Sequence, residues 1–405
     1  MNAASTSPAV PPPTATRRLL SLDALRGFDM FWIVGGEEII HALYKAWPIA
    51  PFRFLHVQMD HVPWIGVHFY DLIFPLFVFI VGASIVFSLG KTIEREGKAA
   101  ALKRIFVRSL IIFACGLLVY GGLSKGFDQI RWMGVLQRIA LSYFFTSLIF
   151  CFFQLRAMVL ICASLLVGYW VLVSFVPFRD FNLERQHLQA LGLRPNDTET
   201  AERFYATKHL VRGRFEDGLC LPQHIDYQYL PGFKWDGAYD PEGILSTFPA
   251  IATCLLGVFA GFLLKNHAIA DQQKVNYLMV AGIAGLVLGF LWGLQFPVIK
   301  KIWTSSYVLV AGGFSCLFLA AFYQIIEIWQ LRRWCTPFVW IGTNAITIYL
   351  AFHLIEFDKY AALVVGGPVQ RGLRNWGDLL MAIVVVSMSL AFVRFLYQRK
   401  IFLRF

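Results

Sequence analysis

Successive apolar stretches of membrane length constrain this chain more than any other feature of its sequence. A helix needs about 20 apolar residues to cross roughly 30 Å of hydrocarbon, and the sequence offers about ten such stretches. Hydrophobic residues make up 58% of the 405 residues and charged residues only 15%, which excludes an ordinary soluble domain. We therefore expect an all-α polytopic membrane protein whose first partner is the lipid bilayer. The predicted spans lie near residues 20–40, 69–90, 105–123, 132–153, 157–177, 245–264, 275–296, 305–327, 337–356 and 377–396.

The distribution of lysine and arginine predicts the orientation of these spans. The loop 91–108 is strongly basic, and every second loop after it carries basic residues as well. By the positive-inside rule both termini are expected in the cytoplasm. The net charge of +11 is then mostly a consequence of membrane topology, so we do not expect a nucleic-acid partner.

Two segments outside the spans differ in composition. Residues 1–16 are rich in Pro, Ala, Ser and Thr and lack the pattern of a signal peptide, which predicts a disordered leader. The segment 178–244 is expected on the external face and is rich in aromatic residues, Asp and His. Such a composition suits a sugar-binding surface, because sugar CH faces pack on rings and hydroxyls need fixed acceptors. An interfacial aromatic belt on a folded cap fits the composition equally well.

Cysteines and metal ligands give little further information. Of the seven cysteines, most lie within predicted spans, and only Cys220 lies in the external segment. No disulfide framework and no metal site are expected from this spacing.

A titratable cluster precedes the second predicted span and is the first candidate for chemistry. His61, Trp64, His68 and Asp71 come directly before a long apolar run. We select His61, because imidazole can take a proton near neutral pH or act as a nucleophile. It needs a neighbouring group to fix its tautomer, for which Asp60 and Asp71 are the candidates. A lone histidine at a membrane interface is, however, more often structural than catalytic.

Arginines inside predicted spans are costly in hydrocarbon and therefore need partners. Asp23 and Arg26 are three residues apart on one helix face, which allows a local ion pair. They could also receive a phosphorylated donor from the cytoplasm. Arg138, in the fourth span, is expected to pair with an acidic side chain such as Asp71, Glu37 or Glu38. For Arg138 the structural role is favoured.

Six sequence blocks resemble a known family. The blocks are RLLSLDALRGFDMFWIVGG, HVPWIGVHFYDLIFPLFVFIVGAS, GVLQRIA, YDPEGILSTFPAIATCLLGVFAG, KKIWTSSYVLVAGG and IGTNAITIYL. They occur in the family's order and extend over spans one to nine, and they resemble the heparan-α-glucosaminide N-acetyltransferase family of transmembrane acyltransferases.

This resemblance implies an enzyme with a ten-helix core. Residues 17–405 would form a transmembrane acyltransferase domain with an external cap loop at 178–244. The domain would take acetyl-CoA, a co-substrate, from the cytoplasm and pass its acetyl group to a glucosamine-like amino sugar on the other side. No metal is implied. A bacterial-type member of the family would lie in the bacterial inner (plasma) membrane. His61 matches the family's active-site histidine and Asp71 an aspartate in a supporting role. Glu37 stands where the family commonly has an active-site asparagine, and its carboxylate could accept a hydrogen bond and attract an ammonium group.

The remaining candidates follow from their places in these blocks and in the basic loops. For binding the glycan or amino-sugar acceptor we select Trp64, Asp240, Glu242 and Asn344. For binding acetyl-CoA we select Arg26, Asp23, Arg104 and Arg138.

Several alternatives stay open at this stage. Acetyl transfer could be direct, with His61 as the base, or could pass through an acetylated His61. The natural acceptor, and whether nitrogen or oxygen is acylated, are also open. A large apolar surface would permit a homodimer. The alternative function is a polytopic transporter or flippase of an envelope glycan or small solute, in which the polar residues inside the spans would line a path.

Overall fold

The computed structural model describes residues 19–122, 124 and 126–402, and this part of the chain is predominantly helical. The predicted leader, 1–16, lies outside the described residues. The strands among them are two short ones, β1 (Phe178–Arg179) and β2 (Leu210–Val211), which pair antiparallel. The expectation of an all-α chain is confirmed.

Seven helices in the described part of the chain are long and apolar enough to cross a membrane. They span Phe69–Val119, Val135–Phe152, Leu155–Phe175, Thr247–Lys265, Asp271–Gly293, Ser305–Ile328 and Asn375–Gln398, and correspond to α4 to α6, α10 to α12 and α17, with short 3-10 or π turns at the ends of α4 and α12. An eighth span is formed if α13 (Thr336–Thr343) and α14 (Ala345–Ile355), which meet at 80°, are counted together. The polytopic membrane architecture is confirmed.

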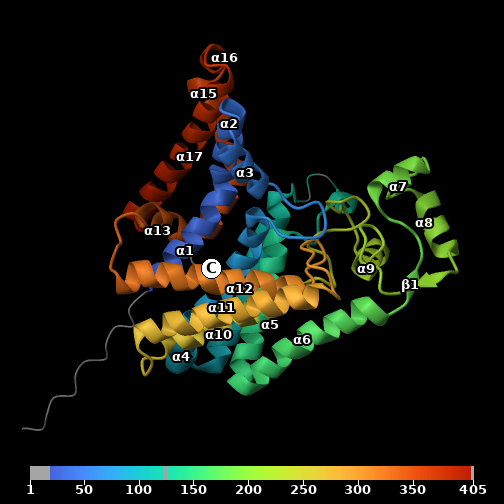
Figure 1. Cartoon of the computed structure of the whole chain (residues 1–405), viewed down its shortest axis with the longest axis horizontal. Helices are drawn as coiled ribbons and strands as arrows, with labels where there is room; N and C mark the ends of the chain where they lie inside the picture. The colour runs from blue at the N-terminus through green and yellow to red at the C-terminus, as the bar shows by residue number, and fades with distance from the viewer. Residues whose placement is uncertain (1–18, 123, 125, 403–405) are drawn as a thin grey trace, which may run out of the picture.

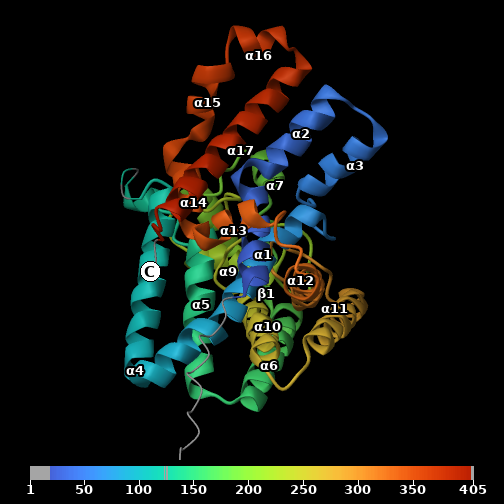
Figure 2. The same ribbon diagram turned by 90° about the vertical axis from the view of Figure 1, so that its left-hand side faces the viewer.

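The difference from about ten predicted spans arises at two kinks. Helix α4 (Ile73–Val119) contains two predicted spans, and Gly97, with φ of 84°, breaks it between them. Figure 2 shows α4 as two arms that meet at the lower end of the view. The first predicted span is divided into α1 (Leu20–Phe31) and α2 (Glu37–Ala46) by a π turn in which Val34 and Gly35 are not helical.

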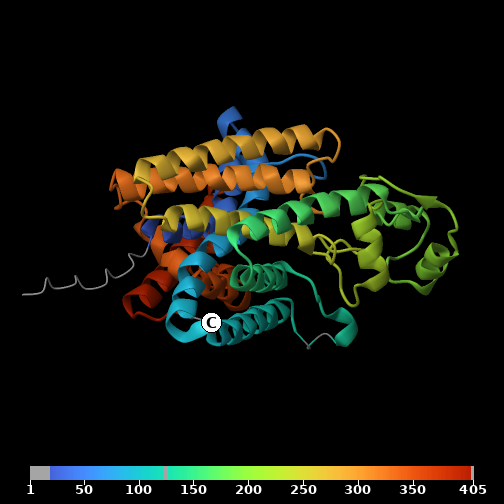
Figure 3. The same ribbon diagram turned by 90° about the horizontal axis from the view of Figure 1, so that it is seen from below.

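Burial distinguishes the central from the peripheral helices. The most apolar windows of α4 and α10 (Thr247–Lys265) are 78% and 72% buried, whereas those of α6 (Leu155–Phe175) and α11 (Asp271–Gly293) are only 28% and 22% buried. Helix α11 lies along the outside of the bundle in Figure 3. Its exposed apolar side chains are suited to contact lipid rather than water.

Glycines allow two pairs of helices to touch backbone to backbone. A Cβ atom at Gly82 of α4 would lie 1.9 Å from the carbonyl oxygen of Cys254, and one at Gly257 of α10 would lie 1.9 Å from that of Phe79. Helices α1 and α13 meet in the same reciprocal way at Gly27 and Gly342. Since only glycine leaves room for such contacts, these residues fix how closely the helices approach.

The segment 178–244, which we call the cap segment, is folded and lies at one end of the bundle (Figure 1, right). It contains α7 (Arg185–Ala190), α8 (Thr198–Ala206) and α9 (Leu221–Tyr229). These elements enclose a small apolar core of their own around Leu188 and Phe204. The remaining helices are α3 (Ala50–Met59), α5 (Val135–Phe152), α12 (Ser305–Tyr323), α15 (Phe357–Val365), α16 (Pro368–Gly372) and α17 (Asn375–Gln398).

The α4–α10 contact generates the first testable prediction. Gly257→Ala should destabilise the protein, because the new methyl group cannot fit beside the Phe79 carbonyl, and overpacking of this kind costs about 1–3 kcal/mol. Thermal unfolding in detergent should show a lower midpoint. The control is Gly168→Ala in α6, where an added Cβ meets nothing within 4 Å. Equal midpoints for the two variants would contradict the prediction.

Candidate functional site

A cavity of about 680 Å³ lies where the loop before α4, the cap segment and the segment before α12 meet. We call it the His61 cavity. Its polar and aromatic lining comes from widely separated parts of the chain. It includes His61, Trp64, Asp71, Tyr120, Arg131, Trp235, Asp236, Glu242, Lys300, Lys301, Trp303 and His353.

Asp71 organises the loop that carries His61. Its carboxylate is almost fully buried, and its Oδ2 accepts hydrogen bonds from the backbone N–H groups of Val62, at 3.2 Å, and His68, at 3.0 Å. Its Oδ1 lies 2.8 Å from Nδ1 of His61. A carboxylate at Nδ1 selects the tautomer in which Nδ1 carries the proton, so the lone pair of Nε2 is available as a base.

The imidazole of His61 faces the cavity with half of its side chain exposed. On its other side the ring packs against Tyr70, with ring centroids 4.9 Å apart. Tyr70 in turn is hydrogen-bonded to Glu37. Glu37 is therefore one side chain away from His61 and does not itself line the cavity.

Lys300 is the closest cation to His61 among the described residues, and sequence reasoning missed it as a site residue. Its Nζ lies 3.3 Å from Oδ1 of Asp71, and 2.9 Å and 3.2 Å from the two ring nitrogens of His61. The lone-pair directions of the two nitrogens diverge, so one ammonium cannot lie along both. Burial lowers the pKa of Lys300. The site thus holds one carboxylate between two groups that can carry positive charge.

Trp64 connects the His61 loop to the cap segment. Its indole N–H donates to the carbonyl of Phe215 at 2.6 Å. The neighbouring Ile65 forms a β-bridge with Ile299, next to Lys300. The structure therefore brings Trp64 into the cavity and uses its polar atom to fix the loop.

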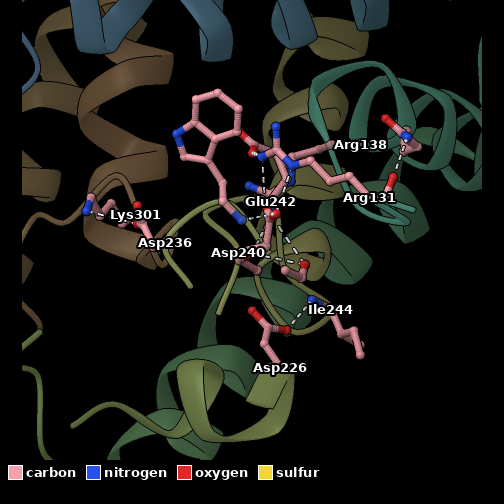
Figure 4. Close-up of polar contacts among 12 residues, drawn as sticks. Arg131, Arg138, Asp226, Asp236, Asp240, Glu242, Ile244 and Lys301 are labelled. Atoms are coloured by element: carbon pink, nitrogen blue, oxygen red, sulfur yellow. Dashed lines mark hydrogen bonds and ion pairs between the residues drawn. The ribbon is translucent and has the colours of Figure 1, made fainter. Parts of the chain in front are cut away.

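Asp240 and Glu242 are both bound to Arg131, a buried arginine that sequence reasoning did not select (Figure 4). The Arg131 guanidinium donates to both oxygens of Asp240, at 2.8 and 2.7 Å, and to Glu242 at 2.7 Å. It lies between the rings of Tyr120 and Trp235. Glu242 lines the His61 cavity, and burial raises its pKa to about 7. Asp240 does not line the cavity and supports Arg131 instead.

Arg138 is fully buried and does not lie with the other donor candidates. It donates to the Ser246 hydroxyl and to the Gly243 carbonyl, and it stacks over the ring of Trp303. The expected partners were Asp71, Glu37 or Glu38. The carboxylates that oppose its charge are instead Glu242 and Asp240, which precede α10. Arg138, which lies beside Arg131 in Figure 4, therefore makes contacts that fit a structural role.

A second cavity of about 230 Å³ lies among α1, α4, α5 and the break between α13 and α14. We call it the Arg26 cavity. Arg26 donates to Asp23 at 3.2 Å and to Ser84 at 2.6 Å, and also bonds the Gly342 carbonyl. Asn344 lines this cavity and not the His61 cavity, although we selected it for the acceptor.

The basic residue that accompanies Arg26 differs from the one selected. Arg104 is exposed, donates to Thr92 at 3.2 Å and does not line the Arg26 cavity. Arg108, one helical turn further along α4, does line it and stacks over the Tyr143 ring. Arg104 and Arg108 are four residues apart and therefore lie on one face of the helix, so the sequence offered Arg108 as an alternative to Arg104 for this site.

A narrow apolar hollow of about 10 Å³ lies between the two cavities. It shares Phe77, Ile139 and Ile346 with the Arg26 cavity and Val135 with the His61 cavity. The two cavities are therefore joined by a shared lining and separated by an apolar constriction. No group of three or more His, Cys, Asp or Glu side chains within 19–122, 124 and 126–402 is arranged to hold a metal ion.

Comparisons with known proteins show what the chain is similar to. Residues 18–205, which include His61 and Asp71, match the family model described as heparan-alpha-glucosaminide N-acetyltransferase, catalytic. The human heparan-alpha-glucosaminide N-acetyltransferase is 28% identical over 97% of this chain and 60% of its own length. The mouse protein of the same name is 27% identical over 96% of this chain and 61% of its own length. The chain thus spans about three fifths of the length of the curated relatives it matches, and over residues 18–205 it is similar to the heparan-alpha-glucosaminide N-acetyltransferase family.

Proposed function

We propose that this protein is a transmembrane acetyltransferase that moves an acetyl group from acetyl-CoA to the amino group of a glucosamine-like sugar. The observation that carries the proposal is the His61–Asp71 pair, 2.8 Å apart, at a cavity large enough for a sugar. The similarity to heparan-alpha-glucosaminide N-acetyltransferases supports the same chemistry. Two cavities that are joined by a shared apolar lining inside the bundle support transfer between two sides of a membrane.

The proposed orientation places the Arg26 cavity toward the cytoplasm and the His61 cavity toward the external side. The turn between α10 and α11 lies at the end of the bundle opposite the cap segment (Figure 1), and Lys265 and Lys274 are in the helices on either side of it, which supports this assignment. Both termini would then be cytoplasmic, in a bacterial inner membrane. The cap segment would face the periplasm or cell envelope, where the acceptor is found.

His61 acts as the general base in this mechanism. Nε2 takes a proton from the acceptor nitrogen, and the neutral amine attacks the carbonyl carbon of the thioester. The new C–N bond forms as the C–S bond breaks, and the CoA thiolate leaves with the proton returned from the imidazolium. The acylated nitrogen then loses its remaining extra proton to the freed Nε2 and from there to water. Asp71 stabilises the imidazolium. In the two-step alternative Nε2 itself is acetylated first, with loss of the CoA thiolate, and the amine then attacks acetyl-histidine and releases the imidazole.

Lys300 supplies positive charge where the thioester oxygen becomes negative. A carbonyl carbon within reach of an amine bound at Nε2 also lies within reach of the Lys300 ammonium, which is 3.2 Å from Nε2. Fixed donors aimed at a developing oxyanion act strongly in a site that excludes water. Glu242, at the same cavity, is placed to attract the acceptor ammonium.

The Arg26 cavity is the proposed entrance for the donor. Arg26 and Arg108 offer positive charge to the phosphates, and Asp23 holds Arg26 in place. The side-chain oxygen of Asn344 is buried without a hydrogen-bond partner, which suits a contact with the donor. The thin pantetheine arm would pass between Phe77 and Ile139, where the helices must separate to admit it.

Removal of His61 is the direct test. Purified protein incubated with radiolabelled acetyl-CoA and glucosamine should form N-acetylglucosamine, and His61→Ala should lower turnover by about 10²–10⁴, the usual contribution of a general base. His209→Ala is the control, because His209 is exposed in the cap segment and bonded to Asp180. Transport of sugar into proteoliposomes without acetylated product would favour a transporter and overturn the enzyme.

Lys300 gives a second, independent test. Lys300→Met should lower kcat by about 10²–10³, the typical loss for one oxyanion donor, while Lys300→Arg keeps part of the activity. Lys301→Met is the matched control, since Lys301 lies next in the chain and pairs with Asp236 at 2.9 Å. Equal kcat values for the Lys300→Met and Lys301→Met variants would refute the role given to Lys300.

The donor entrance predicts a change in KM. Arg26→Gln should raise the KM for acetyl-CoA by about tenfold, one charge-assisted contact, with little effect on the KM for glucosamine. Arg104→Gln should leave both values unchanged, because Arg104 lies outside the Arg26 cavity. An unchanged KM for acetyl-CoA in the Arg26 variant would move the donor site elsewhere.

A further inference from the structure

A hollow of about 350 Å³ opens on the cap side of the His61 cavity. It is separate from the Arg26 cavity and from the apolar constriction, and we call it the second hollow. Its wall contains the amides of Gln129 and Asn196, the carboxylate of Asp197 and the rings of Tyr205 and Tyr227. The floor is provided by Lys234.

One short ribbon separates this hollow from the His61 cavity. Arg131 forms an antiparallel β-bridge with Gly232, and the N–H of Phe233 donates to Ile130 at 3.1 Å. A turn begins at Lys234, whose carbonyl accepts from the N–H of Gly237 at 3.1 Å. Lys234 lines the second hollow, whereas its neighbour Trp235 lines the His61 cavity. The two hollows share this wall.

Lys234 is a largely buried lysine whose ammonium has no protein partner within the described chain. The residue is only 8% exposed, its ammonium keeps some contact with solvent, and it makes no hydrogen bond or ion pair with any residue in 19–122, 124 and 126–402. The nearby carboxylates are already engaged: Asp240 binds Arg131, and Asp226 accepts from the N–H of Ile244 at 2.8 Å (Figure 4). Burial accordingly lowers the pKa of Lys234. A buried charge of this kind is costly unless an acceptor reaches it.

The lining identifies the class of group that would reach Lys234. One carboxylate oxygen of Asp197 accepts a hydrogen bond from the backbone N–H of Arg194 at 2.9 Å. The other oxygen can accept a hydrogen bond from a hydroxyl group. Amides can donate and accept, and tyrosine rings offer faces for CH groups. Because Asp128 and Asp197 also line the hollow, a simple anion such as phosphate is disfavoured. Neutral sugar units combine hydroxyl donors, oxygen acceptors and apolar faces.

We propose that this hollow is a second sugar subsite, which binds the next unit of the acceptor glycan while the terminal amino sugar occupies the His61 cavity. This inference rests on the proposed acetyltransferase function and defines its acceptor as an oligosaccharide. Lys234 donates hydrogen bonds to the oxygens of that second unit. Tyr205, whose ring is about half exposed at the hollow, packs against its CH face.

The test compares acceptors of different length. The probes are glucosamine and an oligosaccharide with one terminal glucosamine followed by two N-acetylglucosamine units, so that each carries a single amino group. The oligosaccharide should show a KM at least about tenfold lower, as one hydrogen bond to a charged group provides. Lys234→Met should remove that advantage and leave the KM and kcat for glucosamine unchanged, which also shows that the variant is folded.

Matched variants and a binding measurement keep the test decisive. Lys208→Met, an exposed lysine of the cap segment, should behave as the unmodified protein, and Tyr205→Ala should weaken the oligosaccharide alone. Equal KM values for both sugars, or an equal effect of Lys234→Met on both, would overturn the subsite. If neither sugar is acetylated, the proposed function fails. Direct binding of the oligosaccharide then decides the subsite, and equal affinity with and without Lys234 would reject it.

Discussion

The buried carboxylate of Asp71 is the interaction on which the candidate site depends. Its two oxygens hold the loop of residues 61–68 through backbone N–H groups and fix the His61 ring, while its backbone carbonyl accepts from Tyr307 of α12 at 2.6 Å. One residue thus joins the loop, the start of α4 and a helix far along the chain. Removing the carboxylate would free the imidazole and leave Lys300 without its counter-ion. Asp71 therefore sets both the position of the base and the charge of the site.

A second charged cluster fixes the cap segment to the bundle. Arg131 and Arg138 come from the end of one connection and the start of α5, and their charges are opposed by Asp240 and Glu242, which precede α10. Breaking a buried ion pair costs more than the pair gains, because it leaves one charge uncompensated. The cluster therefore specifies where the cap segment sits. Trp64 fixes the same segment from the other side of the His61 cavity.

Contacts between residues close together in the sequence could be predicted, whereas contacts between distant residues could not. His61 and Asp71 lie ten residues apart around a turn and a helix start, so their contact was within reach of sequence reasoning. Lys300 is 239 residues from His61, and its contact depends on how α12 packs, which no local pattern reports. The same limit explains why the positions of Asn344, which lines the Arg26 cavity, and Arg104, which does not line it, were not predicted. All-α membrane architecture was predictable because hydrocarbon permits so few alternatives.

Breaks in the helices occur where cavities need polar backbone or side chains. The α13–α14 break at Asn344 lies at the Arg26 cavity, and the irregular loop around His61 lies at the other. Exposed carbonyl groups at a helix end are costly in hydrocarbon and attract cations. Arg26 donates to such a carbonyl, that of Gly342, while its charge also faces the cavity. The group that stabilises the broken helix is therefore the one available to an anionic donor, and binding of the donor would be coupled to the geometry of that break.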